Sequence, residues 1–188
     1  GRYERAMEVT GSPFATALLG LGRDDEAVAL AREVAAASPG DSASMLNLLN
    51  VLGLAGRHDA VLDYFERRWG SLEALEEYFG FEDMTAEVTM VAAAQSILGR
   101  SEAKSRTLAQ WGMRLEHLRQ QGYAMPFFRS IESGYEALAG DRERALELLE
   151  MTIEGGYLNP FLQWAPEFHA FRGDPEFERL VNRNYQRI

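Results

Sequence analysis

The stretch LAGDRERALELLE, from Leu138 to Glu150, decides how this chain is expected to fold. A glycine, a charged cluster and an apolar helix, in that order, suit either a phosphate-binding loop or a turn between two helices. A phosphate loop requires the pattern GxxxxGK[ST], and this stretch has neither the second glycine nor the Lys-Ser/Thr pair. We therefore interpret it as a turn, in which Gly140 ends one helix and Asp141 helps to begin the next.

The same arrangement occurs three more times along the chain, as LLGLGRDDEAVALA, VLGLAGRHDAVLDYF and SILGRSEAKSRTLA. In each copy an apolar helix ends in glycine, a charged stretch follows, and an alanine-containing helix resumes. The structural turn glycines are separated by 34, 43 and 41 residues, and they are Gly22, Gly56, Gly99 and Gly140. A recurrence of this size is typical of a helical solenoid, in which each helix pair buries its apolar face against its neighbours.

The first unit resembles the tetratricopeptide repeat, because Ala15, Gly22, Ala27 and Pro39 have the spacing of that family's small residue, glycine, alanine and proline. Later units depart from the pattern, with the alanine one position early at Ala60 and again at Ala103. The resemblance covers roughly residues 9–155. It implies an all-α fold, a right-handed α-α superhelix of about four helix pairs with a C-terminal capping segment.

The whole chain, 1–188, is expected to form a single domain of this type. A short extra helix is expected in SLEALEEYFG, because Ser71 suits a helix start and Gly80 a helix end. The predicted segments are repeats at about 9–40, 41–70, 85–122 and 125–155, the inserted helix at 71–80, and the cap at 157–188.

The cap contains two pairs, Asn159-Pro160 and Asp174-Pro175, each of which is expected to open a helix. Its apolar side chains are expected to plug the end of the solenoid, and they are Phe161, Leu162, Trp164, Phe168 and Phe171. The element RGDPEF (172–177) resembles a pattern that follows the last repeat in bacterial multidomain regulators. Similar C-terminal regions occur in winged-helix transcription activators, adenylate cyclases and serine/threonine kinases.

Composition excludes several classes of protein. The chain has 29 acidic and 19 basic residues, a formal charge of −10, so it lacks the basic footprint of a nucleic-acid-binding surface. It has no cysteine for disulfides or thiolate metal sites, and no apolar run approaches the ~20 residues that span a bilayer. The start, GRYERAMEV, lacks an initiator Met and a signal peptide, so we expect a cytoplasmic fragment of a longer protein.

No catalytic or metal-binding motif is found in the sequence. The histidines, His58, His117 and His169, form no HExxH or equivalent spacing, and His58 is expected to be solvated in a turn. No GxSxG elbow occurs either. We therefore expect no enzymatic activity, no metal and no cofactor.

The family resemblance implies that the first helix of each pair lines a concave face. Register transfer gives a groove of small, mildly polar and apolar side chains, although packing of these residues against a neighbouring helix is an equally weighted alternative. The candidate binding residues are Ser12, Thr16, Leu19, Leu46, Asn47, Asn50, Leu54, Thr89, Ala93 and Ser96. Only Asn47 matches the clamp with which one subclass holds a peptide's terminal carboxylate, so chaperone-tail binding is not expected.

These observations predict a protein-interaction or regulatory scaffold module from a bacterial signalling or transcription-regulatory protein. Its partner is expected to be a protein or peptide with a basic or neutral segment, because the chain is acidic. No direct contact with nucleic acid or membrane is expected. One alternative is a homodimer paired through exposed aromatic residues such as Trp69, Trp111 or Tyr78. The other is a small-ligand or hydrolytic pocket within the solenoid.

Overall fold

The computed structural model describes residues 14–79 and 85–188. The all-α prediction is confirmed, since every regular element in these ranges is helical. The predicted binding residue Ser12 and the predicted helix stop at Gly80 lie outside the described residues. The elements are α2 (Ala15–Gly20), α3 (Asp24–Ala37), α4 (Ser42–Leu54), α5 (His58–Arg68), α6 (Leu72–Phe79), α7 (Thr85–Ile97), α8 (Ser101–Gln120), α9 (Pro126–Ala139), α10 (Arg142–Glu154), the 3-10 turns η1 (Leu162–Trp164) and η2 (Pro166–Phe171), and α11 (Pro175–Arg187).

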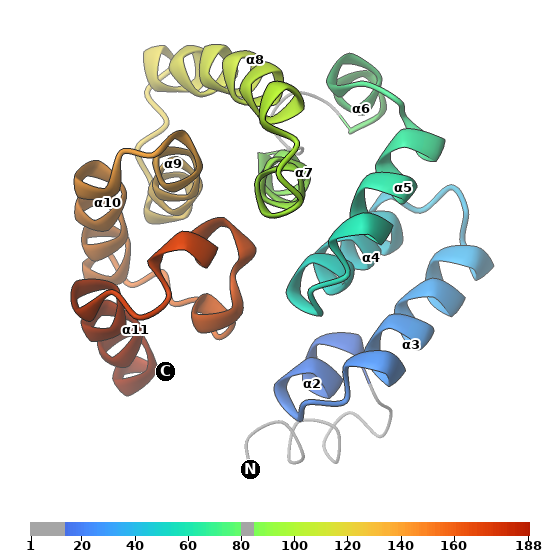
Figure 1. Ribbon diagram of the computed structural model, residues 1–188, viewed down its shortest axis with the longest axis horizontal. Helices are drawn as coiled ribbons and strands as arrows, with labels where there is room; N and C mark the ends of the chain where they lie inside the picture. The colour runs from blue at the N-terminus through green and yellow to red at the C-terminus, as the bar shows by residue number, and fades with distance from the viewer. Residues whose placement is uncertain (1–13, 80–84) are drawn as a thin grey trace.

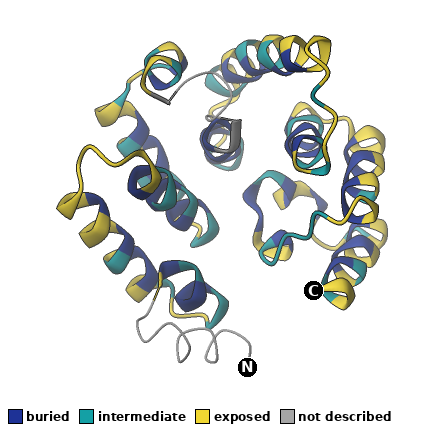
Figure 2. Ribbon diagram, turned by 180° about the vertical axis from the view of Figure 1, so that it is seen from behind, coloured by how far each residue is buried: buried dark blue, intermediate teal, exposed yellow. Residues whose placement is uncertain are grey.

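The helices pack in pairs along an arc, with α2, α4, α7 and α9 on its inner side and α3, α5, α8 and α10 on its outer side (Figure 1). Neighbouring inner helices touch, α2 with α4, α4 with α7 and α7 with α9. The outer helices join the pairs by contacting the next inner helix, as α3 does with α4 and α5 with α7. Buried residues accordingly lie where helices face one another, and exposed residues lie on the outer rim (Figure 2).

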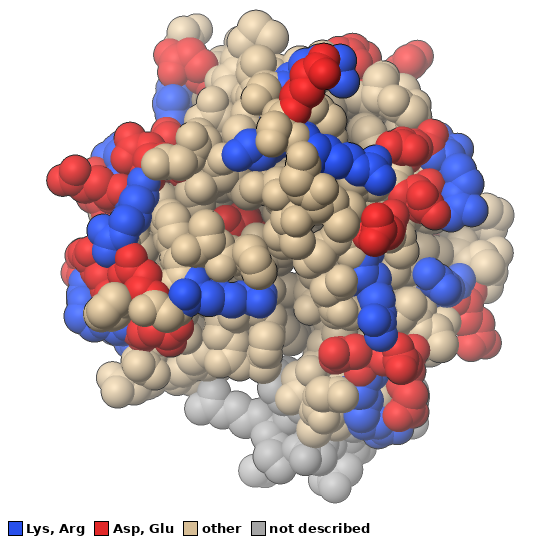
Figure 3. Space-filling model, in the orientation of Figure 1, with Lys and Arg blue, Asp and Glu red and all other residues tan. Residues whose placement is uncertain are grey.

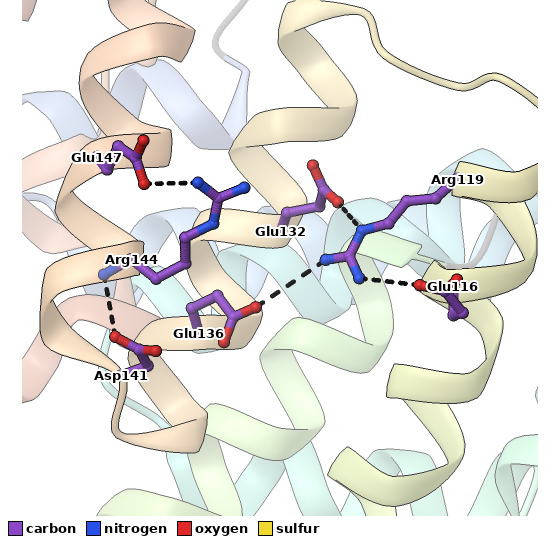
Figure 4. Close-up of polar contacts among 7 residues, drawn as sticks. All are labelled: Glu116, Arg119, Glu132, Glu136, Asp141, Arg144 and Glu147. Atoms are coloured by element: carbon purple, nitrogen blue, oxygen red, sulfur yellow. Dashed lines mark hydrogen bonds and ion pairs between the residues drawn. The ribbon is translucent and has the colours of Figure 1, made fainter.

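The turn at Gly140 and Asp141 joins α9 to α10. Gly140 has a φ of +96°, in the left-handed region that glycine adopts without strain. The carboxylate of Asp141 accepts a hydrogen bond of 3.0 Å from the backbone N–H of Arg144, which satisfies a free donor in the first turn of α10 (Figure 4). The two residues therefore end one helix and start the next.

An ion-pair network joins the last turns of α8 to α9 beside this joint (Figure 4). The guanidinium of Arg119 lies 3.3 Å from the carboxylate of Glu116 on its own helix and 3.9 Å from that of Glu136 on α9. It also forms a short ion pair with Glu132, whose side chain is largely buried. The connection between the third and fourth pairs is thus held by charge as well as by packing.

The core corrects one sequence prediction. Trp111, expected to be exposed for subunit pairing, is fully buried on α8, where its ring packs edge-to-face against Tyr135 at a centroid distance of 5.3 Å. Gly112 allows this contact, because a Cβ there would lie 2.6 Å from the Tyr135 hydroxyl oxygen. Trp69 is half-buried and packs on Tyr64 and on the exposed Tyr78. The three aromatic residues therefore do not form a shared exposed surface.

The two Pro-containing pairs of the cap behave differently. The carboxylate of Asp174 accepts hydrogen bonds from the N–H groups of Glu176 and Phe177, at 2.9 and 3.3 Å, and α11 begins at Pro175 as predicted. Asn159 and Pro160 do not open an α-helix. The side-chain oxygen of Asn159 instead accepts a bond of 2.8 Å from the N–H of Phe161, a tight turn that leads into the short η1.

The segment from η1 to η2 folds back into the inner side of the arc, where η2 contacts both α7 and α9 (Figure 1). Three of the five predicted plug residues, Leu162, Phe168 and Phe171, pack into the terminal core with α9, α10 and α11. Phe161 and Trp164 lie elsewhere, against the concave side of the N-terminal pairs. Three of the predicted plug residues therefore cap the end of the arc of helices, and the other two lie on its concave side.

A clamp on α11 holds the start of this segment. Asn184 is almost completely buried, and its side-chain oxygen accepts a bond of 3.0 Å from the N–H of Asn159 while its amide N–H donates to the Asn159 carbonyl at 2.8 Å. The hydroxyl of Tyr185 donates to the carbonyl of Pro160 at 2.9 Å. Docking of α11 on α10 therefore sets where the fold-back begins.

We predict that Gly140→Ala lowers the free energy of unfolding by about 1 kcal/mol, because alanine is strained at positive φ. A Cβ at this position has nothing within 4 Å, so the loss would report backbone strain alone. Gly40→Ala is the matched control, since its Cβ also meets open space and its φ is not in the left-handed region. Urea unfolding of both variants measures the difference, and equal stabilities would contradict the assignment.

We also predict that Asn184→Ala destabilises the chain by about 1–3 kcal/mol, because it leaves the backbone N–H and C=O of the half-buried Asn159 without their partners and removes a buried side chain. Asn182→Ala, on the exposed side of the same helix, controls for helix propensity. Thermal unfolding followed by circular dichroism provides the comparison. A loss no greater than that of the control would show that the clamp does not hold the cap.

Candidate functional site

A cavity of about 340 Å³ lies on the concave side, between the inner helices and the folded-back cap. Helices α2, α4, α7 and α9 form its walls, and the segment from Tyr157 to Glu167 closes the remaining side. The lining residues are Thr16, Asn47, Asn50, Leu54, Thr89, Met90, Phe127, Ser130, Ile131, Tyr157, Asn159, Phe161, Ala165 and Glu167. All four inner helices thus contribute to one space.

The structure brings half of the predicted binding residues into this cavity. They come from three different helices and are Thr16, Asn47, Asn50, Leu54 and Thr89. Leu19 lines a smaller hollow of about 150 Å³, which shares Leu54 and Phe161 with the cavity. Ser96 lines a third hollow, of about 320 Å³, which shares Glu167.

Two other predicted residues do not reach any of these spaces. Ala93 is fully buried in the core of α7, because the inner helices are so closely packed that a small side chain at this position meets a neighbour. Leu46 is half-buried on α4 and does not line the cavity. For Ala93 the packing alternative was therefore the right one.

The sequence reasoning missed the residues from α9 and from the cap. The family register, continued into the fourth unit, selects Phe127 and Ser130, so these two could have been found. Tyr157, Asn159 and Glu167 come from a segment outside the repeats, and only the fold-back brings them to the concave face. No sequence signal marks Glu167 as part of a site.

Glu167 supplies the carboxyl group among the described residues that line the cavity. Its Oε2 atom is buried and has no hydrogen-bond partner in the described part of the chain. Burial raises the pKa of its carboxyl from 4.5 to about 7, although its own backbone N–H opposes the shift. The side chain packs closely against Gly134 on α9, where a Cβ would lie 3.2 Å from Cγ of Glu167. Burial also raises the pKa of Tyr157, and the charge of Glu167 adds to that rise.

The remaining lining groups are amides, hydroxyls, aromatic rings and the aliphatic side chains of Leu54, Met90, Ile131 and Ala165. Among the described residues that line the cavity, none is lysine, arginine or histidine, so no cation from its walls faces the carboxylate. The ring of Phe127 packs edge-to-face on Tyr157 at 5.4 Å, and Phe161 packs on Trp164 at 6.2 Å. The cavity therefore combines one carboxyl group with neutral hydrogen-bonding groups and aromatic walls.

A larger hollow of about 560 Å³ lies between α3, α4 and α5, and it is a weaker candidate. Three of its four charged groups have partners. Arg67 pairs with Asp63 at 3.8 Å, and the guanidinium of Arg68 lies 4.9 Å from the centre of the Tyr78 ring. Among the described residues that line this hollow, none has a buried side-chain oxygen or nitrogen without a hydrogen-bond partner, as Glu167 has.

His58 is not solvated in a turn as expected. His58, the first residue of α5, is half-buried, and its Nδ1 atom is buried. Burial lowers its pKa, and the nearby His169 and Arg172 of the cap lower it further. The fold-back thus brings together two histidines that are far apart in the sequence.

No protein-family model, curated protein or solved structure matches this chain. Within the ranges 14–79 and 85–188, no cluster of histidine and carboxylate side chains has a geometry suited to a metal ion. Over the same ranges, none of the helices has the length and apolar character needed to cross a bilayer.

We predict that Glu167→Gln stabilises the protein at pH 8 but not at pH 5. The raised folded-state pKa, about 7 against 4.5, means that the folded state holds its proton where the unfolded state has lost it. Stability therefore falls as pH rises from about 4.5 to 7, by up to about 3 kcal/mol at and above pH 7. Glutamine removes this cost, because it carries no charge to desolvate.

Thermal unfolding at the two pH values measures the effect. Glu143→Gln, at an exposed position on α10, is the matched control and should behave alike at both. If the stability difference between Glu167→Gln and the unmodified chain were the same at pH 5 and pH 8, the carboxyl would not titrate as its burial requires.

Proposed function

We propose that this chain is a protein-interaction module of the tetratricopeptide type, which binds a segment of a partner protein on the concave side of a right-handed superhelix. The recurrent Gly-charged-Ala joints support this assignment, as does the arc of helix pairs with one helix of each pair inside. The cap element from Arg172 to Phe177 supports a place in a bacterial signalling or transcription-regulatory protein.

One observation carries the proposal. Positions chosen from the family register alone, on α2, α4 and α7, converge on one cavity with the register-equivalent Phe127 and Ser130 of α9. A solenoid whose inner helices had no binding role would be expected to bury small apolar side chains there. These positions instead present asparagine, threonine and serine side chains, which fix the orientation of a bound chain through hydrogen bonds.

The chemistry of the cavity favours binding over hydrolysis. Hydrolysis by paired carboxylates requires an acid and a base on opposite sides of the scissile bond. The described lining of this cavity supplies one carboxyl group, that of Glu167, together with Tyr157 and amide and hydroxyl groups. Such a set can recognise a ligand, and it lacks the second carboxylate of that reaction.

The proposal predicts that filling the cavity abolishes partner binding. Peptides selected from a random displayed library on the unmodified chain should bind Asn50→Trp at least about tenfold more weakly, because the indole would occupy space on the inner face of α4. Fluorescence anisotropy of labelled peptides measures the affinities.

Glu33→Trp is the matched control, because this position is exposed on the outer helix α3 and the variant should retain full affinity. Circular dichroism first establishes that both variants are folded. The proposal fails if no peptide is enriched, or if enriched peptides bind Asn50→Trp as tightly as the unmodified chain.

A further inference from the structure

We propose that the cavity is a cation-binding pocket, in which Glu167 receives a lysine or arginine side chain of the partner segment. This inference rests on the proposed function, and it adds the chemical identity of the group that enters the cavity. It depends on the position of the carboxyl group, the character of the walls and the absence of an internal counter-charge.

The enclosed position of Glu167 destabilises the folded protein when its carboxyl group is ionised. One oxygen of its carboxyl group is enclosed without a hydrogen-bond donor, while part of the side chain lines both the cavity and the adjoining hollow near His169. An ionised carboxylate in such surroundings is destabilising unless a cation or donors compensate it. A bound cation would supply that compensation, so the pocket fits a positive charge that its described lining residues do not provide.

The described lining supplies no positive charge from within. The nearest charged groups of the cap, His169 and Arg172, are placed toward His58 on α5, where they depress its pKa. The nearby Tyr157 is a neutral phenol in the ordinary pH range, because both burial and the carboxylate raise its pKa. A cation that enters the cavity would therefore meet no competing positive charge from the described lining, and its own charge would favour the ionised form of Glu167.

The walls suit a long basic side chain. Phe127, Tyr157 and Phe161 offer aromatic surface to the alkyl stem and to the charged head, an arrangement that attracts cations. The side-chain carbonyls of Asn47, Asn50 and Asn159 can accept hydrogen bonds from an ammonium or guanidinium group. A volume of about 340 Å³ lies at the lower end of ligand sites, which matches one side chain rather than a folded surface.

The surface of the molecule agrees with this picture. Figure 3 shows an acidic side chain recessed in a hollow of uncharged atoms near the middle of the face, with basic side chains on the same face above and below the hollow. The chain carries a formal charge of −10, so a basic segment would be attracted before it docks.

The test uses the full chain, labelled with ¹⁵N, and four probes. Three are short peptides that differ only at a central lysine, norleucine or glutamate, and the fourth is the free amine cadaverine. Norleucine matches the lysine stem without its charge, so the ratio of their affinities isolates the ammonium group. We expect the lysine peptide to bind at least about tenfold more tightly than the norleucine peptide and to shift the amide resonances of Asn50, Thr89 and Glu167.

Two variants locate the effect. Glu167→Gln should remove the preference for lysine over norleucine while the protein remains folded, and Glu143→Gln on the exposed face of α10 should retain it. The inference is overturned if norleucine binds as well as lysine, or if Glu167→Gln leaves the preference unchanged.

The same experiment separates this inference from the proposed function. Peptides that bind at the cavity without a preference for lysine overturn the cation pocket and support the interaction module. If cadaverine binds through Glu167 and no peptide binds, the cavity is a cation-binding pocket for a small free amine, and the proposed peptide-binding function is contradicted. Binding of both lysine peptide and amine through Glu167, with the peptide tighter, supports both proposals.

Discussion

The clamp between Asn184 and the backbone of Asn159 is the interaction on which the concave side of this protein depends. It consists of a reciprocal pair of hydrogen bonds between the buried side chain of Asn184 and the backbone of the half-buried Asn159. Because Asn184 belongs to α11, the clamp forms only when that helix docks on α10. Formation of the terminal core and closure of the concave face are therefore a single event.

The rings of Phe168, Phe171 and Phe177 hold the other end of the fold-back. Their centroids lie 5.3–6.1 Å apart, and they join η2 to the first turn of α11. Between the clamp and this cluster the chain must cross the inner side of the arc. It does so in two short 3-10 turns, which place Phe161, Ala165 and Glu167 against α4, α7 and α9. A segment that packs at the end of the molecule thereby also forms one wall of the cavity.

This double role gives the cavity its unusual electrostatics. An open concave groove would leave a carboxylate in water, where its ionisation has little energetic cost. The packed η2 segment encloses Glu167 instead, and raises its pKa into the neutral range. Buried and unpaired ionisable groups that lower stability are commonly kept for function, and here the cost falls on a residue that lines the proposed binding site. Ionisation of Glu167 therefore lowers the stability of the fold, whereas the same charge would favour binding of a cation at the proposed site.

Local chemistry in the sequence determined the helical units and their joints. Gly140 and Asp141 act through the left-handed conformation and the capping bond, which need only the few residues around them. The left-handed conformation recurs at Gly22, Gly56 and Gly99, whereas the helices that follow these three glycines begin without a side-chain capping bond. The register taken from the resemblance also selected Thr16, Asn50 and Thr89, which do line the cavity, because helical periodicity fixes which residues share a face. It selected Ala93 wrongly, since periodicity does not say how closely the next helix packs.

Only the tertiary structure decided where the cap lies, and with it the character of the site. Whether Glu167 faces water or the cavity depends on its packing against Gly134 of α9, which is far away in the sequence and has no local signature. The burial of Trp111 depends in the same way on Tyr135 of the next helix. Short-range propensities act within a helix and its caps, whereas the burial of a charge is set by every element around it. The sequence alone therefore determined a helical scaffold, and tertiary packing placed a carboxyl group at its centre.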